Sequence, residues 1–148
     1  GTATGGTGAK LFVTPAKLST YKATWTYLGS VASGSLGKDV SSTSSDTIAH
    51  GLGKTPKLVR VSGKFAKATD YMSITDCTYS NSTQSSNHVI FNLEPTLSAS
   101  SGNTFKLAAS SSDYTSMTVT VDATNITLAW SKSGAPTGTA TLIWDAIA

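Results

Sequence analysis

The fold is decided by residues 117–130, MTVTVDATNITLAW, and by residues 139–146, TATLIWDA. In both stretches apolar side chains recur at every second position. A period of two is typical of strands with one buried face, because successive side chains of a strand point to opposite sides. We expect three strands here, paired as an antiparallel meander with one apolar and one threonine-rich face, and with Trp130 and Trp144 in the core.

The middle of the chain carries the same period more weakly. Residues 58–65, 71–79 and 87–93 alternate in this way, and residues 80–87, SNSTQSSN, predict a turn region between the last two. Short strands separated by regular turn signals favour two stacked sheets. The sequence therefore predicts an all-β fold, either an antiparallel β-sandwich or a jelly-roll-like domain.

The N-terminal residues differ in composition from the rest. Residues 1–10, GTATGGTGAK, are too poor in apolar groups to fold alone. Thr14 suits the cap of a short helix that begins at Pro15 and continues through Leu18. We predict an N-terminal linker segment with a short helix at residues 1–21, followed by a β domain at residues 22–148.

The overall composition favours β-strands joined by solvent-exposed turns. The chain has 148 residues, of which 23 are Ser and 24 are Thr, and only 13% are charged. Threonine suits strands and serine suits turns. The single Cys77 excludes an internal disulfide. No run approaches the roughly 18 apolar residues that a membrane span needs, so we expect no membrane insertion.

Charge is distributed unevenly along the chain. Residues 1–67 hold nine Lys or Arg against two Asp, a net +7, whereas residues 68–148 hold two Lys against six acids, a net −4. The basic residues are scattered among Ser and Gly, without the interleaved aromatics or motifs of nucleic-acid binders. We therefore expect no nucleic-acid partner.

Residues 51–55, GLGKT, look like the end of a phosphate-binding loop. The full motif needs another glycine at position 48, which is Ile48, and it needs a helix directly afterwards, which Pro56 disfavours. Glycines here instead permit positive φ or a close backbone approach, and a proline suits the start of a strand. The sequence predicts a structural hairpin corner made by His50, Gly51, Gly53 and Pro56.

No pattern of catalytic or metal-binding residues is visible. His50, His88 and Cys77 are not spaced like metal ligands, and no nucleophile motif occurs. We expect no enzyme, no cofactor and no metal. Five acids adjoin Ser, Thr or strand ends and are expected to cap turns: Asp39, Asp46, Asp113, Asp122 and Asp145.

Three tyrosines border polar segments and are the candidates for ligand contact: Tyr71, Tyr79 and Tyr114. Aromatic rings with a polar tip suit glycan stacking, and they equally suit the rim of a subunit interface. If the chain is a binding module, we expect its contacts at the loops of residues 29–46, 79–87 and 94–103.

Two stretches resemble elements of bacteriophage proteins. Residues 12–18, FVTPAKL, resemble the V-T-P-x-x-L element that recurs in tail fibres just before a distal module. Residues 48–61, IAHGLGKTPKLVRV, resemble an I-x-H-G-L-G-x-T-P-x-x-V-x-V pattern of small β modules in phage fibres and other virion proteins.

This resemblance implies a homotrimer in the virion, in which the N-terminal segment continues a fibre shaft and the β domain is displayed at the tip. Its partners would be its own copies, other virion proteins, and a glycan or protein of the host cell surface. The leading hypothesis is a tail fibre distal module used in host attachment. The alternatives are a capsid decoration or head-fibre protein, and a secreted carbohydrate-binding module.

Overall fold

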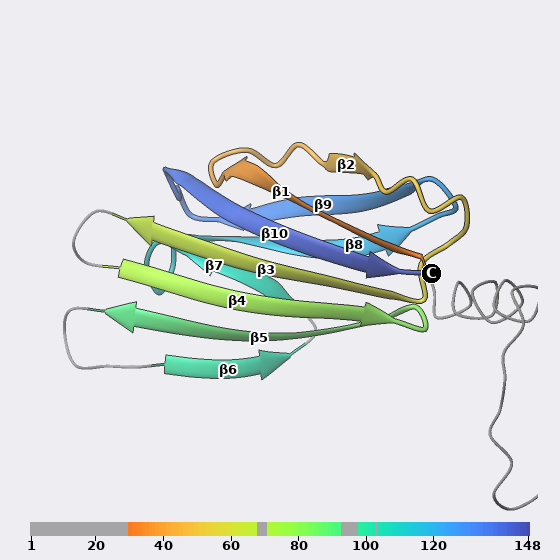
Figure 1. Cartoon of the computed structure of the whole chain (residues 1–148). Coiled ribbons are helices and arrows are strands. Elements are labelled where there is room, and N and C mark those ends of the chain that lie inside the picture. Colours follow the sequence, from red (N-terminus) through yellow and green to blue (C-terminus); the bar gives the residue numbers. More distant parts are fainter. Residues whose placement is uncertain (1–29, 68–70, 93–97, 103) are drawn as a thin grey trace, which may run out of the picture. The chain divides into compact units, whose positions relative to one another are not determined.

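The computed structural model describes residues 30–67, 71–92, 98–102 and 104–148 (Figure 1). Within these ranges the chain forms strands and no helix. The strands are β1 (Val31–Asp39), β2 (Asp46–Ala49), β3 (Leu58–Lys67), β4 (Tyr71–Ser80), β5 (Thr83–Asn92), β6 (Ser98–Gly102), β7 (Phe105–Ala108), β8 (Tyr114–Val121), β9 (Asn125–Ser133) and β10 (Thr139–Ile147).

These strands form two antiparallel sheets, which lie one behind the other in Figure 1. The larger sheet has the order β1-β10-β3-β4-β5-β6, and the smaller has the order β2-β9-β8-β7. Buried side chains from both sheets belong to one hydrophobic cluster. The predicted all-β class is confirmed, and the arrangement is β-sandwich-like.

Some predictions concern residues outside the described part of the chain. The short helix at residues 15–18 is among them. All described strands belong to one compact unit, Val31–Ala148. The predicted boundary after residue 21 stays a prediction.

The core is built from alternate residues of β9 and β10. Leu128 and Trp130 on β9, and Leu142 and Trp144 on β10, are each at most 9% exposed. Burying each of these side chains stabilises the fold by about 1.5–3 kcal/mol. The alternation that predicted a buried face in the C-terminal third is therefore confirmed.

The pairing of these strands differs from the prediction. β9 pairs with β2 and β8, whereas β10 lies between β1 and β3 in the other sheet. Residues 134–138 carry the chain from one sheet to the other, with Gly134 and Gly138 at φ values of 65° and 123°. The predicted meander of three neighbouring strands is wrong, because alternation shows which face is buried and not which strand lies alongside.

The predicted turn region at residues 80–87 is also wrong over most of its length. Only Asn81 and Ser82 form the turn, with φ values of 49° and 62°, and β5 begins at Thr83. Two residues in the left-handed region are typical of the tightest hairpin turns. Residues 29–45, whose sequence suits either a polar loop or weak edge strands, contain β1 at the edge of the larger sheet, and the expected binding segment 94–103 contains β6.

The edge of the smaller sheet at β7 is closed by polar side chains of β4. The Ser73 hydroxyl accepts a hydrogen bond from the Ala108 N–H at 3.1 Å, and the Thr75 hydroxyl donates to the Lys106 carbonyl. Ser73 and Thr75 are fully buried. They satisfy backbone groups that the edge strand would otherwise leave without partners.

Gln84 of β5 continues this closure along β8. Its side-chain amide donates to the Met117 carbonyl at 3.0 Å and accepts from the Val119 N–H at 2.8 Å. A side-chain amide has the same donor and acceptor groups as a peptide, so Gln84 substitutes for a neighbouring strand.

A cluster around one buried lysine joins the two sheets at the opposite edge. Lys38 of β1 is only 3% exposed, and its Nζ lies 3.4 Å from Asp46 Oδ2 and 2.8 Å from the Ser44 carbonyl oxygen. Trp130 Nε1 donates to the same carboxylate oxygen at 2.7 Å. The lysine also lies 4.9 Å from the centre of the Trp130 ring. A buried charge is tolerated when its partners are this complete.

Gly63 marks the closest approach between the sheets and generates the first prediction. A Cβ at this position would lie 2.5 Å from the Phe105 ring and 2.8 Å from Leu142 Cδ2. We expect Gly63→Ala to lower the free energy of unfolding by about 1–3 kcal/mol through overpacking. The matched control is Gly37→Ala, whose Cβ would meet only Thr139 Cγ2 within 4 Å, at 3.7 Å.

Urea unfolding followed by tryptophan fluorescence measures both variants. If Gly37→Ala lowered the free energy of unfolding as much as Gly63→Ala, the packing argument would be contradicted.

Candidate functional site

The described domain has two distinct ends. At the near end Val31 pairs with Ile147, and the Lys57 N–H donates to the Ile147 carbonyl at 2.8 Å. The label C marks this end in Figure 1. At the far end, β1 finishes at Asp39 and β10 begins at Thr139 opposite it. Strand β1 therefore begins, and strand β10 ends, at the same end of the domain.

Three loops meet at the far end: residues 40–45, 109–113 and 134–138, hereafter the far-end loops. The Val40 N–H donates to the Gly138 carbonyl at 3.0 Å, and the Ala135 N–H donates to Asp113 Oδ1 at 2.9 Å. Lys132 Nζ, beside them on β9, donates to the Ser41 carbonyl at 3.0 Å. These contacts hold the three loops in one fixed arrangement.

The surface of the far-end loops is rich in hydroxyl groups. Its exposed hydroxyl residues are Thr43, Ser44, Ser45, Ser111, Ser112 and Thr137. Asp39, just before the first loop, accepts hydrogen bonds from the side chain and backbone of Ser41, and these bonds lower the pKa of its carboxyl. The far-end loops thus present uncharged donors and acceptors on a backbone that is already ordered.

The corner at residues 50–57 lies at the near end and is built around His50. This side chain is 5% exposed, and its Nδ1 accepts a hydrogen bond from the Leu52 N–H at 3.1 Å. The proton must then lie on Nε2, which donates to the Asp122 carbonyl at 3.2 Å. Gly51 and Gly53 have φ values of 67° and 70°.

The corner connects β2 of one sheet to β3 of the other, so describing it as a hairpin is wrong. Its hydrogen bonds and positive φ values nevertheless account for the glycines without any phosphate. Pro56 is buried at the end of the corner, ahead of β3.

The hydrogen bonds of His50 generate the second prediction. We expect His50→Ala to lower the free energy of unfolding by about 1–3 kcal/mol, because the buried imidazole is lost and the partly buried Leu52 N–H and Asp122 carbonyl lose their partner. Lys54→Ala, at an exposed position of the same corner, should change it by less than about 0.5 kcal/mol. Thermal unfolding of both variants tests this prediction. A His50→Ala variant as stable as the unchanged chain would contradict it.

Asp122 caps the turn that faces His50. Its Oδ1 accepts from the backbone N–H groups of Thr124 and Asn125, each at 2.7 Å, and from the Thr124 hydroxyl at 2.8 Å. These hydrogen bonds, with the Thr124 N–H first, lower the pKa of the Asp122 carboxyl below its usual 3.8.

A lowered folded-state pKa gives a defined acid dependence, which is the third prediction. Between the folded and unfolded pKa values the unfolded chain binds more protons, so stability rises with pH there. The contribution of Asp122 is complete above about pH 3.8 and is lost as the pH falls through the lower folded value. We expect the free energy of unfolding of Asp122→Asn, measured by denaturant titration between about pH 2 and 5, to fall less steeply with decreasing pH than that of the unchanged chain. If the free energy of unfolding of the variant fell as steeply as that of the unchanged chain, this role of Asp122 would be contradicted.

Not every acid caps a turn as expected. Asp46 instead pairs with Lys38, and Asp145 pairs with Arg60 through the guanidinium Nε, at 3.0 Å, and Nη2, at 2.9 Å. The expectation is wrong for these two residues, because Asp145 lies inside β10 opposite Arg60 of β3, and Asp46 begins β2 where Lys38 of the other sheet reaches it.

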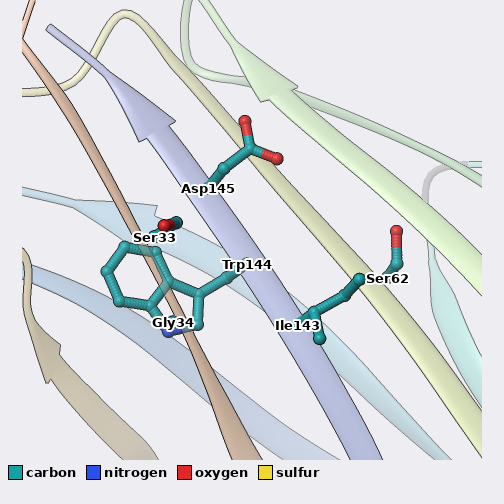
Figure 2. Close-up of a pocket in the computed structure, with 6 residues that line it drawn as sticks. All are labelled: Ser33, Gly34, Ser62, Ile143, Trp144 and Asp145. Carbon is teal, nitrogen blue, oxygen red and sulfur yellow. The ribbon is translucent and has the colours of Figure 1, made fainter.

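A second candidate surface lies on the outer face of the larger sheet. Figure 2 shows one hollow there, of about 340 Å³, lined by Ser33, Gly34, Ser62, Ile143, Trp144 and Asp145. A second hollow of about 400 Å³ is lined by Arg60, Ser62, Asp76, Cys77, Thr78 and Asp145. A third of about 340 Å³ is lined by Ser62, Gly63, Lys64, Ile74, Thr141 and Ile143. All three share Ser62, and we name them the Ser62 hollows.

The first hollow depends on Gly34. In Figure 2 the Trp144 indole reaches from β10 to β1 beside Gly34. A Cβ on Gly34 would lie 2.9 Å from Trp144 Nε1, so only glycine lets the indole pack against β1 at this point. Ile143 and Asp145, which flank Trp144 on β10, then project from the opposite face of the sheet.

The predicted ligand-contact tyrosines are not brought together. Tyr79 lines a hollow of about 310 Å³ at the near end, together with Pro56 and the Asn81–Ser82 turn. Tyr114 begins β8 toward the far end, where Lys106 Nζ lies 4.7 Å from the centre of its ring. The side chain of Tyr71 lies outside the described part of the structure. Ligand contact by these residues stays a prediction.

The described residues hold no group of three or more His, Cys, Asp or Glu side chains that could bind a metal ion. Cys77 is buried, and its burial raises the pKa of its thiol. In the same ranges there is no helix with the length and apolar character of a membrane span.

Comparisons with protein-family models, with curated proteins and with solved structures find no match to this chain. Its function is therefore inferred from its own residues and their arrangement.

Proposed function

We propose that this chain is a structural module of a bacteriophage virion, at the distal part of a tail fibre, and that it contacts the host surface. The proposal draws on the resemblance of residues 12–18 and 48–61 to elements of phage fibre proteins. It also draws on the geometry of the domain, which separates the point of attachment from the candidate contact surface.

This separation is the observation that carries the proposal. The chain enters the domain at Val31, and the three cross-tied far-end loops lie at the other end of β1. A module joined to a shaft through its near end would present these loops outward. Loops that are already ordered lose less conformational entropy when they bind.

The contact surface proposed here is narrower than the loops expected from the sequence. Residues 40–45 belong to the expected segment 29–46 and are kept. The expected segment 79–87 is set aside, because its turn at Asn81 and Ser82 lies beside the corner of the near end. Residues 134–138 are added because a hydrogen bond ties them to the first loop, and residues 109–113 are added because a hydrogen bond ties them to residues 134–138.

We further propose a homotrimer that is anchored to other virion proteins through its N-terminal segment. Three copies would multiply contacts that are weak individually, since the second and third contacts become intramolecular. We propose no catalytic activity. Both ring nitrogens of His50 are engaged by backbone groups, so this histidine cannot act as a base without losing the corner.

Competition for phage adsorption tests this function and is the fourth prediction. The purified chain, added to host cells before the phage, should reduce adsorption. The double variant Ser111→Arg with Thr137→Arg should lose about tenfold in potency, because two bulky cations interrupt the exposed hydroxyl surface. Thr118→Arg, exposed on the outer face of the smaller sheet, is the matched control and should compete like the unchanged chain.

Failure of the unchanged chain to compete would contradict attachment. Full competition by the double variant would contradict the far-end loops as the contact surface. Saturable binding to empty capsids, with no binding to cells, would instead favour capsid decoration.

A further inference from the structure

We propose that the Ser62 hollows form a binding site for a neutral oligosaccharide. This site is separate from the far-end loops, and the inference does not depend on the chain being part of a virion. It is carried by the arrangement of side chains across four neighbouring strands of the larger sheet.

The hollows form one continuous surface because their lining residues stand in register. One row across the sheet runs from Ser35 through Ile143 and Ser62 to Asp76. The adjacent row runs from Ser33 through Asp145 and Arg60 to Thr78. Neighbouring strands lie about 4.8 Å apart, so each row repeats its side chains on the scale of a sugar ring.

The polar groups of these rows match vicinal sugar hydroxyls. Ser62 Oγ donates to Asp76 Oδ1, and Asp76 Oδ2 has no hydrogen-bond partner among the described residues. Arg60 forms a salt bridge with Asp145, yet the Arg60 side chain is still 58% exposed. A hydroxyl group donates and accepts at once, so adjacent hydroxyls can bond to a carboxylate and a guanidinium side by side.

The charges around the hollows favour a ligand without net charge. Arg60 and Lys64 are balanced by Asp76 and Asp145, and all four line the second or third hollow. An anionic or cationic ligand would gain attraction from one pair and repulsion from the other. A neutral polar ligand gains hydrogen bonds from both.

The apolar groups suit the carbon faces of sugar rings. Ile143 is 57% exposed and Ile74 is 39% exposed, and both line the third hollow. Across the sheet Ile143 is flanked by Ser35 and Ser62, whereas Ile74 stands between Lys64 and Val89. Ser62 and Lys64 of β3 therefore separate the two isoleucines, whereas a stable contact between protein chains usually has a continuous apolar centre. The hollows are also shallow and joined, which suits an extended polymer better than an enclosed small molecule.

An NMR titration of the full ¹⁵N-labelled chain tests the proposal. The probes are neutral hexasaccharides of glucose, galactose, mannose and N-acetylglucosamine, with a sialylated and a sulfated oligosaccharide for comparison. We expect at least one neutral hexasaccharide to bind with a Kd of about 0.1–1 mM and to shift the amide signals of Ser62 and Ile143.

Two site variants and one matched control give the fifth prediction. Ile143→Ser and Asp76→Ala should each weaken this binding about tenfold. Val31→Ser removes another exposed apolar side chain from the same face, one that lines none of the Ser62 hollows, and should leave the Kd within about twofold. Unchanged amide spectra away from each substitution will show that the variants fold.

Three results would overturn the proposal. The first is no binding of any neutral hexasaccharide up to about 10 mM. The second is binding that neither Ile143→Ser nor Asp76→Ala weakens, or tighter binding of a charged oligosaccharide. The third concerns a chain that binds no sugar and sediments as an oligomer. If the Ile143→Ser variant then sediments with the mass of one chain, the face is a contact between copies of the chain. Because this site is separate from the far-end loops, a failure of sugar binding would leave the proposed attachment function standing, and the adsorption competition tests that function independently.

Discussion

The structure depends on the burial of one row of side chains on β10 against the smaller sheet. Ala140, Leu142, Trp144 and Ala146 alternate inward along this strand, and each is almost completely buried. β10 also has neighbours on both sides, β1 and β3. Its inward row therefore fixes the separation of the sheets, while its outward residues Ile143 and Asp145 are held firmly in the centre of the outer face. The same strand supplies the core and the middle of the Ser62 hollows.

Polar side chains secure the two sheets on either side of this core. Ser73, Thr75 and Gln84 satisfy the backbone of β7 and β8, and the Lys38–Asp46 pair with Trp130 joins β1 to the smaller sheet. Such interactions add modest net stability, but breaking one leaves a buried group without a partner, which is costly. They therefore favour one alignment of the sheets over others. A fixed alignment is also what lets three separate loops meet at the far end.

Much of the fold could be predicted from the sequence, since period-two alternation identified the all-β class and the buried rows of β9 and β10. It could not identify strand neighbours, because a buried face looks alike whether the next strand lies beside it or across the core. The first half of β5 was missed because Gln84 and Ser86 point inward in place of apolar residues, whereas its second half falls within the strand expected at residues 87–93. The polar side chain of Gln84 closes a sheet edge, and nothing local distinguishes that use from a turn.

The candidate surfaces were still harder to predict. Ser62, Asp76 and Asp145 are far apart in the sequence, and they meet only through the registers of β10, β3 and β4. Asp113 and Ala135 likewise meet only because the chain crosses between sheets at residues 134–138. The corner at His50 was easier, because its glycines, histidine and proline are contiguous. Local chemistry could be predicted from contiguous residues, whereas surfaces made by several strands could not.

The placement of β10 is the central claim, and nuclear Overhauser contacts along its backbone test it most directly. The account predicts cross-strand contacts from Leu142 to Leu36 on one side and to Gly63 on the other. Backbone contacts from β10 to β9 as adjacent strands would contradict it, since the two sheets, the far end and the outer face would then all be arranged differently.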